Sequence, residues 1–401
     1  MSAPHGFSEP SPGGHLLPAR IGSAFPQAPR PRKTRTGPLI GTFGALVAVA
    51  AVGALQVTAN LGYDDTRAEF DSARETVQDT AADVTLSSDQ LVSTSDTATL
   101  LLNSDSGVLA DPTAKEALAV SITEAADTSA SADQVLDTVL PDEGSKPVFF
   151  WELFGASDGL RLDIQDLEDL DSELAEESPA LAEAETLVTD AGLAFLGSAA
   201  TAAASFEAAH VSAKNDDVIA LRDAASTAAG ASALDDSTVT TFVALQDAAA
   251  QVVASENAEL SEKAGPLQGV RLEIEAYARS LAPGVLLEFD WNQIVNTAGE
   301  NGSMGGLTTW WWDEPDRAVI ELSNSVAEQW PADRSKALVA HEVGHAISVK
   351  CEDMYDSSTQ DSIEKWATAW AISMGFTDDA NGVWAYGYPP QSYIDAAAGC
   401  R

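Results

Sequence analysis

The chain contains 401 residues, 62 of them acidic and 21 basic, which gives a formal net charge of −41. So large an acidic excess cannot neutralise phosphate groups, and it therefore excludes a nucleic-acid-binding role. It suits a soluble, self-repelling extracellular surface. Hydrophobic residues make up 45% of the chain, which is enough for packed cores, and the length allows two or three domains.

The N-terminal residues predict a membrane anchor. Residues 1–37 are rich in Pro, Gly and Ser and carry five basic residues against one acid, a composition typical of a disordered tail. The uncharged apolar run Leu39–Val57 follows, and its length suits a helix that spans a bilayer. We expect a single transmembrane helix over residues 38–58, with the basic tail in the cytoplasm and the rest of the chain outside the cell membrane. The alternative is a signal peptide cleaved after Ala59, which would make the protein secreted.

Residues 59–265 predict an acidic, largely helical ectodomain. Ala, Asp, Ser, Thr and Glu dominate this region, and apolar residues recur every three or four positions, as on one face of a helix. We expect several long helices that fold back on each other as a bundle. The clearest apolar stripes are Leu160, Ile164, Leu167, Leu170 and Leu174 in one helix and Phe242, Leu245, Ala249 and Val252 in another.

Turn-forming residues divide the helical region. Breaks are expected at residues 141–144, Pro179, Gly230 and Gly265–Pro266. An aromatic cluster at residues 149–154 interrupts the polar pattern. Core packing is the expectation for this cluster, and a plug in the bundle, a partner contact or a position near the membrane are the alternatives.

Residues 266–401 differ in composition and predict an α+β domain. Eight of the nine tryptophans lie between Trp291 and Trp384. Two segments alternate as strands do, residues 306–312 and 317–323, and a turn at 313–316 would join them. In the second strand Ala318, Ile320 and Leu322 would share one face, and two helices are expected after it, over residues 334–350 and 362–374.

The first of these two helices contains the motif His341-Glu342-Val343-Gly344-His345. Two histidines four residues apart lie on nearly the same helix face, so both imidazoles can bind one ion. Zinc suits this pair, and Glu342 beside it can take a proton from the water that zinc activates and pass it to the leaving amine. Gly344 costs about 1 kcal/mol in a helix interior, and a closely packed neighbour would explain why it is tolerated.

The same motif on a solvated helix face would carry no function. The flanking residues contradict that interpretation, because Ala337–Ala340 and Ala346–Val349 are almost entirely apolar. Burying two histidines and a glutamate in such a helix is costly unless another group pairs with them. The pattern therefore indicates a metal site.

With these residues, the region 305–375 resembles the zincin superfamily of metallopeptidases. The resemblance implies that the strand before the active-site helix borders the substrate cleft, and residues 317–323 are placed to be that strand. It also implies a third ligand after the helix. The metzincin pattern would put a histidine at Cys351, so this chain departs from it, and no histidine follows His345.

The gluzincin variant of the superfamily instead takes a glutamate from a second helix, and Glu364 lies nineteen residues beyond His345. Many gluzincins have an aspartate four residues later that orients a zinc-bound histidine; that position is Thr368 here. Glu364 could alternatively serve only as part of a capping box. The other candidate ligands are Asp361, Asp356, Asp353 and Glu352.

The two cysteines, Cys351 and Cys400, are expected to form a disulfide, because the compartment is oxidising and the pair is complete. The bridge would close a loop of about fifty residues, worth roughly 3–4 kcal/mol. The alternative is Cys351 as a zinc ligand. For the oxyanion of a tetrahedral intermediate, the candidates are Tyr386 and Tyr388, with Tyr393 nearby, although packing roles would also explain these tyrosines.

The sequence thus predicts a membrane-anchored, zinc-dependent peptidase that acts on extracellular protein or peptide substrates. His341, His345 and Glu364 would hold Zn²⁺, and Glu342 would be the catalytic residue. One alternative is an adhesion or scaffold ectodomain with a structural zinc site, which a closed site with Cys351 as fourth ligand would support. A further alternative keeps the metal chemistry and changes the substrate to cell-wall peptide crosslinks.

Overall fold

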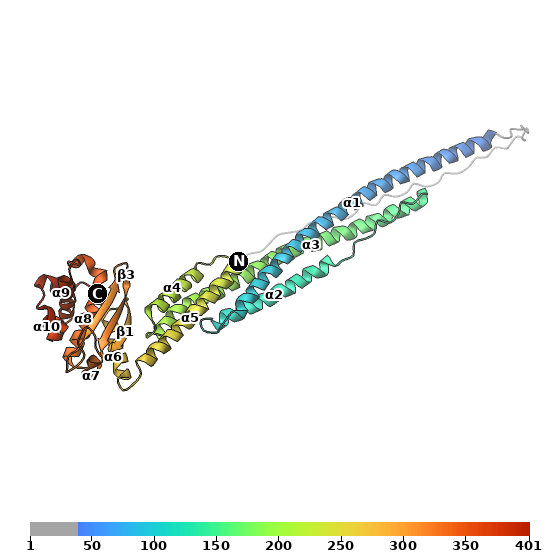
Figure 1. Ribbon diagram of the computed structural model, residues 1–401. Coiled ribbons are helices and arrows are strands. Elements are labelled where there is room, and N and C mark those ends of the chain that lie inside the picture. Colours follow the sequence, from blue (N-terminus) through green and yellow to red (C-terminus); the bar gives the residue numbers. More distant parts are fainter. Residues whose placement is uncertain (1–38) are drawn as a thin grey trace, which may run out of the picture. The chain divides into compact units, whose positions relative to one another are not determined.

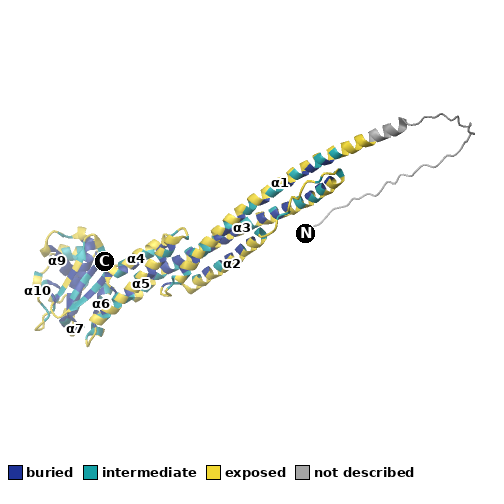
Figure 2. Cartoon of the chain, turned by 45° about the vertical axis from the view of Figure 1, so that its right-hand side comes forward, coloured by how far each residue is buried: buried dark blue, intermediate teal, exposed yellow. Residues whose placement is uncertain are grey.

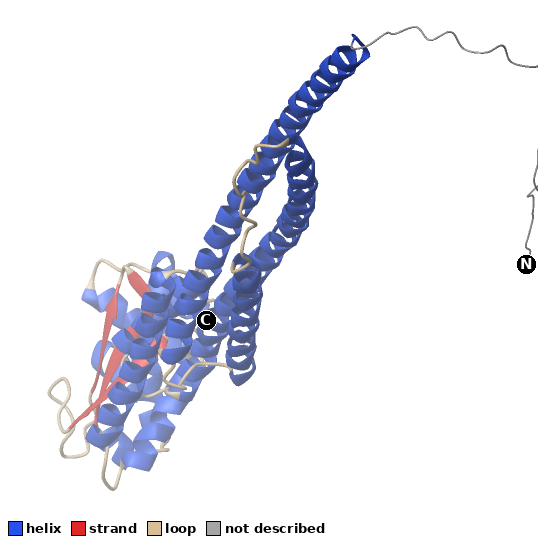
Figure 3. Cartoon of the chain, turned by 90° about the vertical axis from the view of Figure 1, so that its right-hand side faces the viewer, coloured by secondary structure: helices blue, strands red, loops and turns tan. Residues whose placement is uncertain are grey.

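The computed structural model describes residues 39–401, with side chains from residue 48 onward. Helices make up most of the described chain, and one three-stranded sheet lies in the C-terminal part (Figure 3), in agreement with the predicted α+β class. The predicted tail at 1–37 lies outside the described residues. Residues 39–58 of the predicted anchor form the beginning of helix α1 (Leu39–Asn103).

The chain divides into two compact units. The smaller one joins the part of α1 up to Asp65 to the segment Ser145–Ser157, and the larger one contains 66–144 and 158–401. Helix α2 (Pro112–Leu136) lies in the larger unit, as does most of helix α3 (Phe150–Ala209).

Buried residues recur every seven positions along the first three helices, which is the spacing of a coiled coil. In the larger unit the helices are linked by hydrogen bonds from Thr80 to Asp171 and between Ser88 and Ser129. The sequence predicted a bundle, but the heptad regularity went unrecognised. The buried heptad positions are Tyr63, Phe70, Val77, Val84, Leu91 and Ala98 in α1, Leu118, Ala125 and Ala132 in α2, and Leu153, Leu160, Leu167, Leu174, Leu181, Val188 and Phe195 in α3.

Helix α3 corrects one predicted break. It continues through Pro179, which is exposed between the buried Leu174 and Leu181. Proline in a helix interior removes one hydrogen bond, and a position on the solvent side lets water satisfy the freed carbonyl. Among the described residues α3 is the one helix long and apolar enough to cross a membrane, and 39% of its apolar stretch is buried inside the structure.

The other predicted breaks are confirmed. The segment 141–144 lies in the loop before α3, Gly230 ends helix α4 (Asn215–Ala229), and Gly265 lies between α5 (Asp236–Glu262) and α6 (Gln268–Leu281). The α5 stripe from Phe242 to Val252 is buried as expected.

A buried ionic cluster connects α5 to α6. The ammonium of Lys263 lies 3.3 Å from Glu259 and 3.2 Å from Glu275, and all three side chains are almost fully buried. Asn215 at the start of α4 donates a hydrogen bond of 3.0 Å to the carbonyl of Ala318 in the sheet. These contacts tie the end of the helical region to the C-terminal domain.

The sheet has the order β1-β3-β2, with β1 at Leu286–Asn292, β2 at Gly306–Trp311 and β3 at Glu314–Ser323. Strand β1 runs parallel to β3, and β2 runs antiparallel to it. The expected strand pair is present, and Ala318, Ile320 and Leu322 are all buried.

Three features of the sheet differ from the expectation. Strand β1 was missed, although Leu287, Phe289 and Trp291 alternate with polar residues as in a strand with one buried face. The turn is shorter than predicted and lies at residues 312–313, while Glu314 to Asp316 continue strand β3 past a bulge. Strand β3, which contains the predicted cleft-bordering residues 317–323, is central in the sheet, and of the three strands only β2 contributes a residue, Gly306, to the lining of the cleft described below.

Helices pack against this sheet to form the core of the C-terminal domain (Figure 1). Helix α7 (Asn324–Glu328) leads to α8 (Asp333–Ser348), which continues as a 3-10 helix at Val349–Met354. Helix α9 (Gln360–Ser373) packs on α8, and Trp366 and Trp370 of α9 are fully buried in the core. The chain ends with the 3-10 helix η2 (Asp379–Asn381), α10 (Val383–Tyr386) and α11 (Gln391–Ala397).

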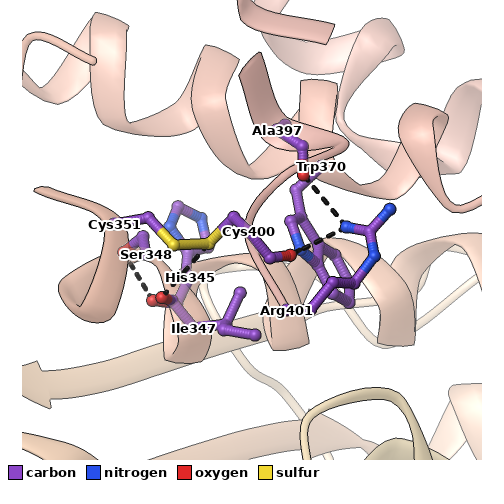
Figure 4. The surroundings of a disulfide bond; sticks show 8 residues. All are labelled: His345, Ile347, Ser348, Cys351, Trp370, Ala397, Cys400 and Arg401. Carbon is purple, nitrogen blue, oxygen red and sulfur yellow. Dashed lines mark hydrogen bonds between the residues drawn. A yellow bond between two sulfur atoms is a disulfide. The ribbon is translucent and has the colours of Figure 1, made fainter. Parts of the chain in front are cut away.

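The predicted disulfide between Cys351 and Cys400 is present (Figure 4). It joins the 3-10 helix after α8 to the end of the chain, and the indole of Trp370 donates a hydrogen bond of 2.9 Å to the carbonyl of Cys400. Both cysteines belong to the hydrophobic core. The bridge therefore fixes the C-terminal segment onto α8 and α9, and Cys351 is not free to bind a metal.

We predict that replacing both cysteines by serine lowers the free energy of unfolding of the C-terminal domain by about 3–4 kcal/mol, because the bridge closes a loop of roughly fifty residues in the unfolded chain. Thermal unfolding followed by tryptophan fluorescence measures this, since eight of the nine tryptophans lie in that domain. Unchanged unfolding, or two free thiols in the non-reduced protein, would contradict the prediction.

Candidate metal centre

Helix α8 holds the His-Glu-Val-Gly-His motif in the interior of the domain. His341, Glu342 and His345 are each about 95% buried, with exposed fractions of 5%, 5% and 4%. The neighbouring Val343 and Ala346 are completely buried in the hydrophobic core. Ionisable groups are buried at a cost unless they are paired or bind a metal, so the arrangement requires a partner for these side chains.

That partner is Glu364 in the first turns of α9. Its Oε2 atom lies 3.2 Å from Nε2 of His341 and 3.1 Å from Nε2 of His345, and the two Nε2 atoms are 3.2 Å apart. Among the described residues, these three form the group of His, Cys, Asp and Glu side chains that could hold a metal ion. The sequence predicted all three as ligands, and the structure brings them together.

The spacing of these three atoms matches one bound ion. Two ligand atoms at about 2.0–2.1 Å from a tetrahedral zinc ion lie about 3.3–3.4 Å from each other. The three observed separations, 3.1 to 3.2 Å, are close to that value. Two imidazole nitrogens and a carboxylate oxygen that converge on one point therefore fit a single cation.

The other candidate ligands have different partners. Asp361 forms an ion pair of 2.7 Å with Lys365 on the same helix. Asp356 accepts hydrogen bonds from Ser358, and Glu352 accepts one from Ser357. These three acids are exposed, as is Asp353. The candidate ligand set is therefore the buried group alone.

Close contact between α8 and α9 allows Glu364 to reach the histidines. A side chain at Gly344 would place its Cβ 2.8 Å from the carbonyl oxygen of Ala367, a separation too short for van der Waals contact. The glycine is therefore tolerated in the helix interior because the backbone of α9 occupies the space where a side chain would lie. This is the closely packed neighbour that the sequence predicted.

The imidazole of His341 has a hydrogen-bond partner behind it. Its Nδ1 lies 3.4 Å from the hydroxyl of Thr368, which itself donates a hydrogen bond to the carbonyl of Glu364. Thr368 can therefore accept from Nδ1–H and leave Nε2 free for the ion, the role of such partners in metal sites. His345 is held differently: its ring stacks on Trp310 with centroids 5.3 Å apart.

Glu342 does not join the ligand group. It accepts a hydrogen bond of 2.8 Å from the hydroxyl of Thr308 on β2. Burial raises the pKa of Glu342, while His341 and the bond from Thr308 oppose the rise. Gly306 makes room for the carboxylate, since a Cβ there would overlap Oε1 of Glu342.

One face of strand β2 supplies residues that the sequence did not identify. Gly306, Thr308 and Trp310 alternate along the strand and all three face α8. Period-two alternation could have placed them on one face, but nothing in the sequence showed which helix that face meets.

A cleft of about 570 Å³ opens beside the group. His341 and Glu342 line it, together with Gly306, Arg334 and Tyr386. The Tyr386 ring stacks on His341, with centroids 5.9 Å apart. Solvent can therefore reach the side of the group on which Glu342 lies.

The structure separates the three candidate tyrosines. Tyr386 is half-buried at the cleft, and burial raises its pKa to about 12, with the carboxylates of Glu364 and Glu342 adding to the rise. Tyr388 is 67% exposed and does not line the cleft. Tyr393 has a packing role: its hydroxyl bonds to Ser362 at 2.7 Å.

The carboxylate of Glu364 is held in its charged form. Burial alone would raise its pKa, but the hydrogen bonds from His341 and His345 more than offset this, and the pKa lies well below its ordinary value. A charged carboxylate beside two imidazoles is the donor set that a divalent cation needs.

Comparison with known proteins gives no further assignment: no protein family matches the chain, and neither the curated proteins nor the solved structures contain a significant match.

We predict that the protein binds about one zinc ion per chain and that Glu364→Gln lowers its affinity by more than about 100-fold. Loss of an outer hydrogen-bond partner costs about 10–100-fold, and loss of a direct ligand should exceed that. Titration against a chromogenic chelator measures the affinity. Asp361→Asn is the matched control, because Asp361 is exposed and paired with Lys365. A loss in this control with none in Glu364→Gln would contradict the assignment.

Proposed function

We propose that the chain is a membrane-anchored, zinc-dependent peptidase that cleaves peptide bonds in extracellular proteins or peptides. One observation carries the proposal: three ligand atoms within 3.2 Å of each other lie next to a buried carboxylate, Glu342, that faces an open cleft. A purely structural metal site needs neither the carboxylate nor the cleft.

Two imidazoles and one carboxylate suit zinc, and they also suit ferrous iron. Glu342 favours zinc and hydrolysis, because it adds a proton acceptor beside the ion. A bound zinc ion would supply Lewis acidity, which polarises the scissile carbonyl and acidifies a water molecule.

Glu342 acts as the general base and then as the general acid. Its carboxylate takes a proton from the attacking water and delivers it to the nitrogen of the leaving amine when the C–N bond breaks. The raised pKa of Glu342 makes the carboxylate a better proton acceptor. Thr308 orients the carboxylate through its hydrogen bond, and Gly306 leaves the space in which it lies.

Tyr386, which lines the same cleft, supports the reaction as a hydrogen-bond donor. Since its pKa is about 12, the phenol remains protonated at neutral pH and can donate a hydrogen bond to the oxyanion. The stacking of its ring on His341 fixes the ring near the ligand group. Because Tyr386 lines the cleft and Tyr388 does not, Tyr386 is the better candidate for the oxyanion donor.

The alternative of a structural zinc site in a scaffold protein has less support. A closed site needs a fourth protein ligand, and the candidate was Cys351, which is in a disulfide. No other His, Cys, Asp or Glu within the described residues completes a fourth position.

We predict that Glu342→Gln lowers the rate of peptide hydrolysis by about 10²–10⁴-fold, because the amide cannot accept the proton. Metal content should not change, since Glu342 is not a ligand. Hydrolysis of a quenched fluorescent peptide library and elemental mass spectrometry measure the two quantities.

The exposed Glu352→Gln variant is the control for this experiment and should behave as the wild type. Equal hydrolysis by Glu342→Gln and the wild type would refute the proposed mechanism. A wild type that binds zinc but cleaves no peptide would instead favour the scaffold alternative.

Tyr386→Phe should lower kcat by about 10²–10³-fold with little change in KM, because one oxyanion donor is removed. Tyr388→Phe is the matched control and should leave both constants unchanged, since Tyr388 faces solvent. Steady-state kinetics on one cleaved peptide tests this, and equal kcat values for the two variants would exclude the oxyanion role.

A further inference from the structure

The segment before and at the start of α3 exposes aromatic side chains to solvent. Val148, Phe149, Trp151 and Phe154 are 76%, 50%, 59% and 45% exposed, whereas Leu153 between them is completely buried. The core packing expected for this cluster is therefore wrong for these residues. The rings of Phe149 and Trp151 stack with centroids 4.7 Å apart, so they form one apolar surface. We call Val148, Phe149, Trp151 and Phe154 the aromatic collar.

The collar is fixed beside the end of the predicted anchor. The side-chain amide of Gln56 donates a hydrogen bond of 2.9 Å to the carbonyl of Val148 and accepts one of 2.9 Å from the backbone N–H of Phe150. Both segments belong to the same compact unit. Gln56 is the second-last residue of the apolar run that ends at Val57, so the aromatic collar lies at the level where that run ends.

The surface of α1 before Gln56 is also apolar and exposed. Val49, Val52 and Leu55 are 71%, 52% and 45% exposed. Figure 2 colours much of this end of α1 as exposed. No charged residue occurs between Arg35 and Asp64. The exposed apolar surface of α1 therefore continues directly into the aromatic collar.

Within residues 148–154 the one charged side chain is the exposed Glu152, and an ion pair lies just beyond the collar. Lys146 forms an ion pair of 2.5 Å with Asp64 and lies over the ring of Tyr63 at 5.4 Å. Along α1 the order is thus an uncharged apolar surface, then the aromatic rings, then an ion pair. Membrane proteins show this order at the boundary between acyl chains and headgroups, where tryptophan is enriched because its ring is apolar and its N–H is polar.

We infer that the aromatic collar inserts into the headgroup boundary of the lipid bilayer that holds the N-terminal helix. The inference rests on the predicted anchor and goes beyond the proposed peptidase activity. We assign the bilayer as the partner of the collar because the collar continues the uncharged surface of α1 and the Lys146–Asp64 ion pair lies just beyond it. The helical region would then contact the membrane at two places, through α1 and through the collar at the start of α3. Gln56 holds these two segments together.

Trp151 allows a direct test, because it is the only tryptophan outside residues 291–384. The full-length chain is reconstituted into phosphatidylcholine vesicles that contain headgroup spin-labelled lipid, and tryptophan emission is measured with and without the label. We expect the label to quench part of the emission in the wild type and this part to disappear in Trp151→Phe. The matched control is Trp312→Phe, which removes a tryptophan that is 43% exposed on the C-terminal domain and should leave the quenched part unchanged.

Equal quenching in the wild type and Trp151→Phe would overturn the inference. So would disulfide-linked dimers of a Phe149→Cys variant in the vesicles combined with no quenching of Trp151, because the collar would then be an interface between two copies. Metal binding and peptide hydrolysis are measured independently, so failure of this inference leaves the proposed function untouched, and the reverse also holds.

Discussion

The close approach of α8 and α9 is the constraint on which the candidate metal centre depends. The backbone of Ala367 lies where a side chain at Gly344 would be, and only at this separation can Glu364 reach both imidazoles. The core tryptophans Trp366 and Trp370 keep α9 in place, and the disulfide fixes the C-terminal segment against the same two helices. The small sheet adds the last part of the site, because its edge strand β2 positions Glu342 through Thr308.

Much of the site could be predicted from the sequence because its chemistry is local. His341, Glu342 and His345 share one helix, so their spacing alone places them together, and Glu364 followed from the resemblance to gluzincins. The contribution of β2 could not be predicted. Thr308 and Trp310 meet α8 through the order of strands in the sheet, and the sequence did not determine that β2, rather than β3, would be the edge strand.

The fold was predicted in class but not in detail. The apolar stripes correctly indicated long helices, yet the heptad spacing from Tyr63 to Ala98 was not recognised because alanine and polar residues weaken the pattern. Proline was expected to end α3, but Pro179 lies on the exposed face and the buried leucines on either side keep the helix continuous. Strand β1 was missed because its partner in the sheet, β3, is about thirty residues away in the sequence.

The central claim is that two imidazoles and one carboxylate bind a single zinc ion. X-ray absorption at the zinc edge of the zinc-loaded full-length protein tests it most directly. The account predicts a first shell of nitrogen and oxygen at about 2.0–2.1 Å, outer-shell scattering from two imidazoles and no sulfur. A sulfur shell at about 2.3 Å, or a spectrum without imidazole scattering, would contradict it.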